Sequence, residues 1–458
     1  MSTVVEEKDD VVEQGVHNYS SAKSYVKPTE PEVIEQLEWF QDQKLALMMH
    51  WGLYCQPGIV ASWALSDVDE EWSRHQINWT DGETFKKQYY DLNKSFNPIR
   101  FQPEEWAQMA SDCGFKYLLL TTKHHDGFCL WDSKYTDYKV TAEDCPYHTN
   151  EHADIVKSMF DAFHEKGIGI GAYFSKADWH TPYYRTPEIP DDKPSTRGPM
   201  YDPKEDPERW EKFVQFTKNQ VLELCENYGK IDILWFDAGW VCERSGQDIR
   251  LGEIVDEARK LQPWVLSVDR TIGGKYENYV TPEMCVPEEP LGIPWESCLT
   301  LGVDFTYEYA DRYKTPRELV NTLIGIVAKG GNMALNVSPQ PDGRIPVDAM
   351  DSLRGLGAWL KTYGEAVYGT RACAPYQAGN ICFTKKGDTV YAIRLYPVAQ
   401  ESVEAKTFIP YTGKVEKVTM VDDNTEVDFT VQEGGISVTV PAGRRGGSAP
   451  IALVFKLQ

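Results

Sequence analysis

The stretch LLLTTKHHDGF, residues 118–128, passes directly from apolar to reactive side chains. The apolar run over residues 116–122 predicts a strand buried on both faces, as in a parallel sheet covered by helices. The chain has only nine histidines, and two of them, His124 and His125, follow this predicted strand. Neighbouring side chains at a strand end point to opposite sides. Both imidazoles therefore reach one site only if the backbone turns, and the Asp-Gly pair that follows favours a turn.

Six further apolar runs flank this stretch and alternate with segments of helical period. The runs lie at residues 45–50, 167–174, 230–237, 263–269, 297–302 and 332–338. The helical segments lie at residues 103–114, 153–167, 207–229, 252–263 and 316–331. Several of these segments have proline near the start and glycine at the end, as helices commonly do. Apolar strands alternating with amphipathic helices predict a parallel sheet covered by helices.

The pattern also indicates how the chain is divided. An eighth strand is expected in the irregular stretch 276–285, which favours a (β/α)8-like TIM barrel over an open doubly wound sheet. The barrel is expected over residues 31–368, after a polar, loosely held leader over residues 1–30. From residue 369 to 458, short alternating segments separated by turn residues predict a C-terminal antiparallel β-sandwich.

Composition limits the classes of partner. A formal net charge of −23 argues against nucleic acid and anionic membranes, because both require clustered Lys and Arg. The 14 Trp, 25 Tyr and 17 Phe residues provide ring faces that can pack against a sugar, although such rings also fill protein cores. We therefore expect a small, neutral substrate.

Cysteine usage and the N-terminal sequence bear on the compartment. The ten cysteines are scattered without metal-type spacing, which indicates reduced core residues and not a disulfide framework. The acidic N-terminus lacks the basic and apolar regions of a secretory signal, and no apolar run reaches membrane-spanning length. These features predict a cytoplasmic protein. The sequence leaves open whether identical copies associate.

Polar and aromatic residues gather where the predicted strands end, which is where an α/β barrel builds its active site. They are His50, Trp51, His124, His125, Tyr173, Trp235, Asp237, Asp269 and Arg270. Each alone has a structural explanation; Asp237, for example, suits a helix N-cap. Their joint occurrence on one rim indicates an active site.

Several reaction classes fit this set poorly. The His-His-Asp sequence resembles a zinc site, but it is neither HExxH nor accompanied by HxH on the first strand, so metal catalysis is a minor alternative. The absence of GxSxG argues against a serine hydrolase. The absence of GxGxxG and GxxxxGK[ST] argues against a nucleotide cofactor.

Glycoside hydrolysis fits better, because it requires only two carboxyl groups that flank the scissile bond, with polar and aromatic groups to orient the sugar. Asp237 follows a buried run that would hold its carboxylate rigidly, which suits a nucleophile. The second carboxyl group must come from elsewhere. The loop over residues 277–297 offers Glu277, Glu283, Glu288, Glu289 and Glu296.

Several segments together resemble the α-L-fucosidases of glycoside hydrolase family 29, over about residues 36–366. The segments are LALMMHWGLYCQPG (45–58), FKYLLLTTKHHDGFCLWDSKYTDYKV (115–140), GKIDILWFDAGW (229–240), PWESCLTLG (294–302) and ELVNTLIGIVAKGGNMALNVSPQPDG (318–343). The resemblance implies a (β/α)8-like catalytic domain with a β-sandwich after it. It also implies a retaining double displacement without metal or organic cofactor.

The resemblance implies roles for individual residues. Asp237 falls on the family nucleophile, and the acid/base is most often the glutamate of the TPE segment, here Glu283. Glu288 and Glu289 are close rivals, and Glu296 stays open. The residues expected around fucose are His50, Trp51, His124, His125, Tyr173, Trp235 and Arg270, with Phe305 as the apolar contact for the sugar methyl group.

One departure from the family concerns the loop after the first strand. Many relatives have a Glu-Trp pair there, whereas this chain reads IVASWALSDVDEEWSRH over residues 59–75. Either Trp63 with Ser62 or Glu71 with Trp72 is the equivalent pair. The contact to the fourth hydroxyl of fucose is therefore undecided between them.

The sequence thus predicts an exo-acting α-L-fucosidase that removes terminal fucose from oligosaccharides or glycoconjugates. Two alternatives are kept: a non-catalytic fucose-binding protein on a decayed barrel, and a metal-dependent barrel hydrolase. The preferred fucosyl linkage and the role of the C-terminal domain cannot be read from the residues.

Overall fold

Seven parallel strands form the central sheet of the computed structural model, which describes residues 7–8, 11–14, 18–74, 82–185, 194–399, 401–445 and 448–458. The strands are β4 (Leu45–Met49), β5 (Tyr117–Lys123), β6 (Gly169–Ser175), β7 (Ile233–Asp237), β8 (Leu266–Asp269), β9 (Glu296–Thr300) and β10 (Asn332–Asn336). Their order is β8-β7-β6-β5-β4-β10-β9. The seven strands predicted from apolar runs are confirmed.

The eighth position of the barrel is filled by an irregular segment and not by a regular strand. Residues 277–284 connect β8 to β9 through isolated bridges, which pair Val280 with Trp295 and Glu283 with Cys298. The eighth strand expected at 276–285 is therefore incorrect as a regular element. Pro282 has no N–H to donate, and Met284 has a positive φ of 52°, so the segment cannot extend a ladder. The bridge to Cys298 nevertheless holds Glu283 at the sheet.

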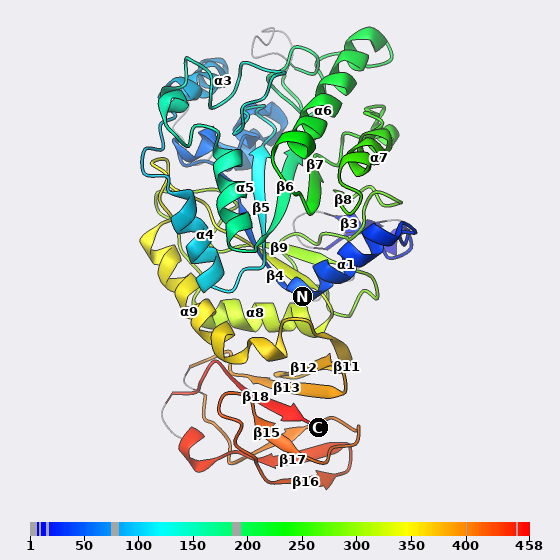
Figure 1. The fold of residues 1–458 in the computed structure, drawn as a ribbon, viewed down its shortest axis with the longest axis vertical. Helices are drawn as coiled ribbons and strands as arrows, with labels where there is room; N and C mark the ends of the chain where they lie inside the picture. The colour runs from blue at the N-terminus through cyan, green and yellow to red at the C-terminus, as the bar shows by residue number, and fades with distance from the viewer. Residues whose placement is uncertain are drawn as a thin grey trace.

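The described part of the chain contains nine α-helices, several of which cover the outer face of the sheet (Figure 1). They are α1 (Pro31–Gln43), α2 (Glu70–Ser73), α3 (Gly82–Tyr90), α4 (Pro103–Asp112), α5 (Ile155–Glu165), α6 (Pro207–Asn227), α7 (Leu251–Leu261), α8 (Pro316–Ala328) and α9 (Val347–Tyr363). Short 3-10 helices lie at Leu53–Cys55, Trp63–Leu65, Asp67–Asp69, Asp91–Ser95, Pro146–Thr149, Glu243–Ser245, Gly364–Ala366 and Ala442–Arg444.

The five predicted helices are confirmed, and side-chain caps mark where three of them begin. Asp154 and Asp206 accept backbone hydrogen bonds at the starts of α5 and α6, and Thr315 forms a capping box with Glu318 at α8. Helices α1, α3 and α9 were not among the segments predicted from the sequence.

Two antiparallel sheets form the C-terminal part of the chain. One has the order β11 (Arg371–Ala378), β12 (Ile381–Lys386), β13 (Thr389–Leu395), β18 (Ala452–Leu457) and β15 (Val418–Met420); the other has the order β14 (Lys406–Ile409), β17 (Gly435–Thr439) and β16 (Phe429–Gln432). Apolar side chains of both sheets share one core, which agrees with the predicted sandwich.

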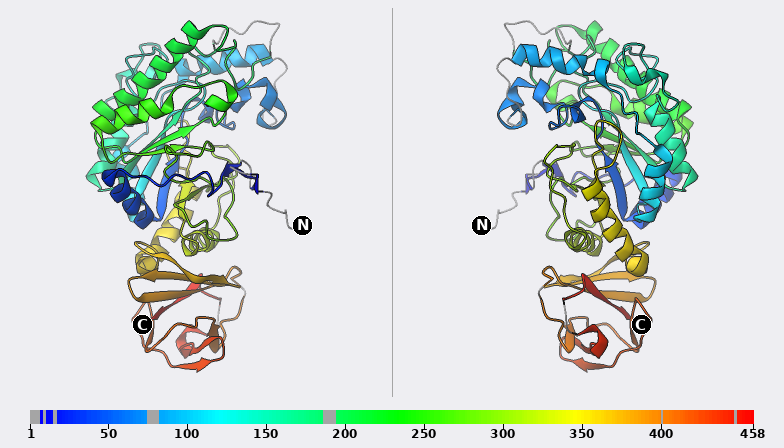
Figure 2. Two further views of the ribbon diagram at one scale, coloured as in Figure 1. Left: turned by 90° about the vertical axis from the view of Figure 1, so that its right-hand side faces the viewer. Right: turned by 90° about the vertical axis from the view of Figure 1, so that its left-hand side faces the viewer.

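These sheets lie at the amino ends of the barrel strands, away from the strands' carboxyl ends (Figures 1 and 2). Arg371 pairs with Asp42, just before β4, and the Tyr368 hydroxyl donates to the carbonyl of Gly114, before β5. Arg317 of α8 donates to the carbonyls of Tyr396, Ala449 and Pro450. The C-terminal sheets are thus bonded to the opposite end of the barrel from its active-site rim.

The N-terminal segment is packed against the barrel where it is described. It contains β1 (Glu7–Lys8), β2 (Val11–Val12) and β3 (Tyr19–Ser20). The Ser20 hydroxyl donates to the buried Glu277 carboxylate at 2.5 Å, and the Gly274 N–H donates to the Ser24 carbonyl at 2.9 Å. The loosely held leader expected over residues 1–30 is therefore incorrect for residues 18–24, while residues 1–6, 9–10 and 15–17 lie outside the described part.

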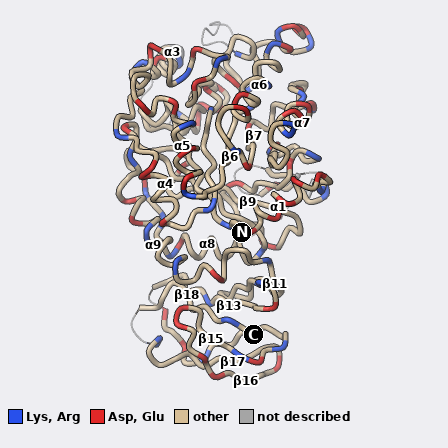
Figure 3. Tube along the Cα trace, viewed as in Figure 1, with Lys and Arg blue, Asp and Glu red and all other residues tan. Residues whose placement is uncertain are grey.

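Charge distribution, cysteine pairing and helix length can also be followed in the structure. Acidic and basic residues are interspersed along the barrel and the C-terminal sheets (Figure 3). All ten cysteines are free. Across the described ranges, the helices are too short or too polar to cross a membrane.

Candidate active site

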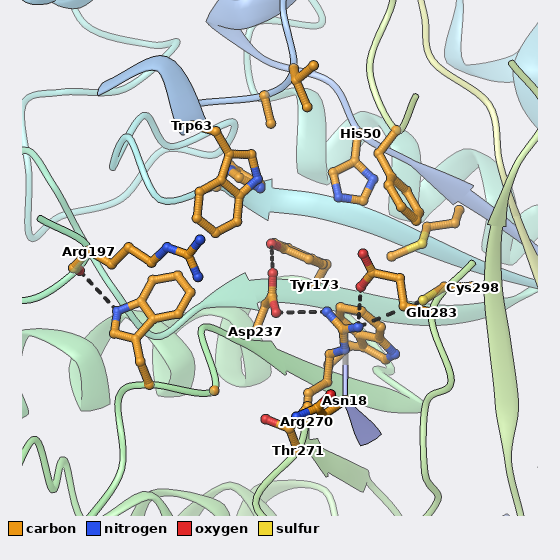
Figure 4. Close-up of a pocket in the computed structure, with 18 residues that line it drawn as sticks. Asn18, His50, Trp63, Tyr173, Arg197, Asp237, Arg270, Thr271, Glu283 and Cys298 are labelled. Atoms are coloured by element: carbon orange, nitrogen blue, oxygen red, sulfur yellow. Dashed lines mark hydrogen bonds and ion pairs between the residues drawn. The ribbon is translucent and has the colours of Figure 1, made fainter. Parts of the chain in front are cut away.

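A cavity of about 400 Å³ opens at the carboxyl ends of the strands. It is lined by Asn18, Met48, His50, Val60, Ala61, Trp63, His124, Tyr173, Arg197, Trp235, Asp237, Gly239, Trp240, Arg270, Thr271, Glu283, Cys298 and Phe305. Its size lies within the usual range for small-molecule sites. The strand ends have therefore brought most of the residues singled out in the sequence to one place (Figure 4).

Two carboxylates share one guanidinium at this cavity. Arg270 Nη1 donates to Asp237 Oδ1 at 2.9 Å, and Arg270 Nη2 makes a short hydrogen bond to Glu283 (Figure 4). The guanidinium also lies over the Trp235 ring, 4.4 Å from its centre. Asp237 ends β7 and Glu283 is bridged to β9, so the barrel sheet fixes both groups.

Asp237 is held in its ionised form. Burial alone would raise the pKa of this carboxyl, but the charge of Arg270, the neighbouring His125 and a hydrogen bond from Tyr173 together lower the pKa far below its usual range. The Tyr173 hydroxyl donates to Asp237 Oδ2 at 2.5 Å. Burial and the nearby Asp237 charge raise the pKa of Tyr173, so its phenol keeps the proton. In the free protein the site therefore contains an ionised, well-oriented carboxylate.

Three buried histidines surround this carboxylate, and each has its Nδ1 atom fixed by a polar partner. The partners are Asn336 for His50 at 2.8 Å, Ser62 for His124 at 2.5 Å and Ser175 for His125 at 2.6 Å. Burial lowers the pKa of all three imidazoles, in His125 to about 4. His50 and His124 line the cavity, where a neutral imidazole with one nitrogen fixed can exchange hydrogen bonds with sugar hydroxyls through the other. His125 was expected beside the sugar as well, but its ring is fully buried and is not part of the lining.

Two of these histidines also belong to the group of side chains that could hold a metal ion. Ligand atoms of His124, His125 and Asp237 lie within 4.8 Å of one another. The Nε2 atom of His125 lies 3.9 Å from Asp237 Oδ2, and the ring is fully buried. Neutral imidazoles and a carboxylate are donors that zinc accepts, so these three residues are the ones that a divalent ion would use.

The five loop glutamates lie in different environments in the structure. Glu283 alone among them lines the cavity in the described part of the chain. Glu288 and Glu289 are exposed and lie outside the lining. Glu296 is fully buried inside the barrel, where it accepts hydrogen bonds from Tyr117, Trp235 and Tyr279, and Glu277 accepts from Ser20 and the backbone of Gly273.

Trp51 differs from its expected place beside the sugar pocket. Its ring packs against Phe96, Phe101 and Trp106 at centroid distances of 5.1–5.9 Å and does not line the cavity. The reason is the alternation of side chains in extended backbone. His50 points into the cavity, so its neighbour points outward to the helix layer.

Of the two candidate pairs in the loop after β4, Trp63 with Ser62 lies at the site. Trp63 lines the cavity, and Ser62 bonds the ring of His124. Glu71 and Trp72 are exposed and outside the lining. Phe305 lines the cavity with its ring centre 5.2 Å from that of His50, which gives the cavity an apolar side.

Comparison with known proteins decides between the classes that this geometry allows. The family model described as "Alpha-L-fucosidase" matches residues 13–365. The chain belongs to this family. Its members are glycoside hydrolases, and this protein is therefore one too.

Individual relatives of the α-L-fucosidase family match most of the chain. Human tissue α-L-fucosidase is 26% identical over 422 residues, which cover 88% of this chain and 84% of the relative. The structure of Thermotoga maritima α-fucosidase in complex with fucose is 26% identical with a TM-score of 0.74, and covers 95% of this chain and 100% of that one. A Bacteroides thetaiotaomicron α-L-fucosidase trapped as a covalent intermediate is 26% identical with a TM-score of 0.74, covering 94% and 97%.

Among the residues that line the α-L-fucosidase cavity and were not singled out by the sequence analysis are Asn18, Arg197, Trp240 and Thr271. Trp240 follows Asp237 by three positions and Thr271 follows Arg270, so their nearness to strand ends was a usable signal. Asn18 and Arg197 lie in segments without strand or helix periodicity near them, and nothing local in the sequence marks them.

Proposed function

We propose that this protein is a retaining, exo-acting α-L-fucosidase that hydrolyses terminal α-L-fucosyl residues by double displacement. Asp237 is the nucleophile and Glu283 the general acid/base. The observation that carries this proposal is the pairing of both carboxylates with Arg270 at one cavity. Retaining glycosidases require their two carboxyl groups only about 5–5.5 Å apart, and a shared guanidinium supports such a separation. The relatives bound to fucose and trapped as a covalent intermediate support the substrate and the retention.

In the first step Asp237 attacks the anomeric carbon while the bond to the departing glycosidic oxygen breaks. Glu283 transfers its proton to that oxygen, so the leaving group departs as a neutral alcohol. In the second step the Glu283 carboxylate accepts a proton from water. The water oxygen attacks the anomeric carbon, and the Asp237 carboxylate is released.

Arg270 suits both steps because one negative charge lies beside it throughout. Double displacement requires a charged Asp237 and a protonated Glu283 before the first step, and an uncharged Asp237 ester with an ionised Glu283 in the intermediate. The guanidinium contacts both carboxyl groups, so it stabilises the charge in either place. This balance lowers the cost of moving charge between the two residues.

The remaining cavity residues suit fucose. The neutral imidazoles of His50 and His124 offer hydrogen-bonding groups to ring hydroxyls. Phe305 supplies an apolar side for the methyl group that distinguishes a 6-deoxy sugar. The ionised Asp237 stands ready to attack without having to lose a proton first.

The test is to incubate the purified protein with an aryl α-L-fucoside and to follow the products by proton NMR. Release of fucose that is first formed as the α anomer is expected. First formation of the β anomer would contradict retention. Calorimetric binding of fucose without any release from the aryl fucoside would instead favour a non-catalytic fucose-binding protein.

We also propose that the protein works in the cytoplasm. Its ten cysteines are all free and seven of them are buried, which suits a reducing compartment. Fractionation of the source cells should place the protein with cytosolic markers, and thiol titration of the denatured protein should find all cysteines reduced. Recovery in a secreted or vesicular fraction would contradict this location.

A further inference from the structure

The cavity has a closed inner part and an open edge. Its inner residues are buried, as in Tyr173 and Trp235, which are each 1% exposed. At the open edge the Arg197 side chain is 40% exposed, and Trp63 and Trp240 are half-buried. An exo-acting enzyme encloses the terminal sugar, so the rest of the glycan extends past the exposed or half-buried lining residues, which include Asn18 and Thr271 as well as Arg197. Residues at the edge are therefore the ones that meet the departing sugar.

Arg197 is held in one orientation at this edge. Its Nε donates to Asp69 Oδ2 at 2.9 Å, and its Nη2 makes a short hydrogen bond to Asp69 Oδ1. Asp69 is 1% exposed, so the anchor itself is rigidly enclosed. The guanidinium lies 4.9 Å from the ring centre of Trp63 and 5.8 Å from that of Trp240.

The backbone of Arg197 is fixed as well. Its carbonyl accepts hydrogen bonds from the indole N–H groups of Trp179 and Trp240 and from the Tyr184 hydroxyl, at 3.0–3.1 Å. Here the side chain and the main chain are both ordered before any ligand arrives, which is how binding sites reduce the entropic cost of association.

The donors that remain determine the ligand class. A guanidinium has five N–H groups, and Asp69 takes one from Nε and one from Nη2. The Nη1 group makes no hydrogen bond to any residue that the structure describes, so it is available at the cavity edge. The charge is already balanced by Asp69, which favours hydroxyl acceptors of a neutral sugar over an anionic group.

We propose that Arg197 determines specificity for a neutral sugar as the leaving group, which rests on the proposed fucosidase function. Arg197 is stacked on Trp63 and Trp240. The guanidinium donates to hydroxyls of the sugar to which fucose is attached. Asp69 is its positioning residue. An aryl leaving group lacks those hydroxyls and gains little from Arg197.

The test compares an aryl α-L-fucoside with whichever of 2′-fucosyllactose or 3-fucosyllactose the wild-type enzyme hydrolyses. Arg197→Met keeps the aliphatic stem on the indoles and removes the donors. We expect the ratio of kcat/KM for the oligosaccharide to kcat/KM for the aryl fucoside to fall about tenfold, the effect of losing one charge-assisted hydrogen bond. Asp69→Asn should shift the ratio in the same direction by a smaller factor, because it loosens the anchor only.

Arg250→Met is the matched control. Arg250 is 37% exposed and pairs with both oxygens of Glu211, but it lies outside the cavity lining. In Arg250→Met, the ratio of kcat/KM for the oligosaccharide to kcat/KM for the aryl fucoside should equal that of the wild type. An equal fall for both substrates in Arg197→Met would overturn the proposal, because Arg197 would then act on fucose itself; so would an unchanged ratio. Wild-type hydrolysis of the aryl fucoside but of neither oligosaccharide would also overturn it. A wild-type protein inert on all three would contradict the fucosidase function itself.

Discussion

The cavity and the barrel interior beneath it contain carboxyl groups whose pKa values are shifted in opposite directions. At the cavity, Asp237 is ionised, because Arg270 and the Tyr173 hydroxyl contact it. Beneath, Glu296 is fully buried and accepts from Tyr117 and from the Trp235 indole, and burial raises its pKa to about 7. Trp235 links the two regions, since its ring also supports the guanidinium. The direct cationic partner, and not the depth of burial, therefore decides which of the two carboxyl groups has a lowered pKa.

The substitution expected to have the largest effect on this contrast between the two carboxyl groups is Asp237→Asn. The amide cannot form the glycosyl ester, so kcat for an aryl α-L-fucoside should fall by at least about 10³-fold. A thermal unfolding curve close to that of the wild type would show that the fold is retained. Activity within tenfold of the wild type would mean that the ionised carboxylate of the cavity is not the nucleophile.

Glu283→Gln should have the next largest effect. Loss of the general acid should lower kcat/KM for a fucosylated oligosaccharide by about 10²–10⁴-fold, and less for an aryl fucoside, whose leaving group needs less protonation. Glu289→Gln is the matched control, because Glu289 belongs to the same loop but lies outside the cavity lining. A larger loss in Glu289→Gln than in Glu283→Gln would reverse the assignment.

The raised pKa of Glu296 should make the unfolding free energy of the protein depend on pH. Glu296 has a folded pKa of about 7 against an ordinary value of 4.5. Between these pH values the folded state keeps a proton that the unfolded state releases, so the unfolding free energy should fall as pH rises from 4.5 to 7, by about 3 kcal/mol from this group.

Glu296→Gln removes this titration. Urea unfolding at pH 5 and pH 8 should therefore find the variant more stable relative to the wild type at pH 8 than at pH 5. The same difference in unfolding free energy at both pH values would show that Glu296 is ionised in the folded protein, and the contrast with Asp237 would be lost.

The smallest effect is expected from metal removal. The contrast assigns the charge state of Asp237 to Arg270, so dialysis against EDTA should leave kcat/KM for the aryl fucoside unchanged. His124, His125 and Asp237 are nevertheless close enough to share an ion. Loss of activity in EDTA that zinc or manganese restores would establish the metal-dependent alternative.

The seven barrel strands were predictable because strands buried on both faces form continuous apolar runs. The residue after such a run must lie at the rim, which is why Asp237 and His124 could be found from the sequence. The irregular segment at the eighth position of the barrel was not predictable from the sequence, because Pro282 and Met284 interrupt the extended backbone. Trp51 was placed incorrectly because alternation sends it to the helix layer.

The second carboxyl group required three-dimensional information. Glu283, Glu289 and Glu296 lie within one loop and its following strand, and local composition does not distinguish an exposed glutamate from one in the cavity or the core. Arg197 also could be assigned to the cavity only from the three-dimensional structure, because this residue is remote in sequence from Asp237 and Asp69 and does not follow a predicted strand. The family resemblance selected Glu283 first among the loop glutamates, and its position beside Arg270 agrees with that choice.

The position of the C-terminal sheets has a practical consequence. They are bonded to α8 through Arg317 and to the chain just before β4 through Arg371, so residue 458 lies at the far side of the molecule from the cavity (Figure 1). An enzyme coupled to a bead or a sensor chip through its carboxyl terminus would hold the cavity outward, toward the solution. Large glycoproteins on cell surfaces or in a flowing sample would then reach it without obstruction by the support.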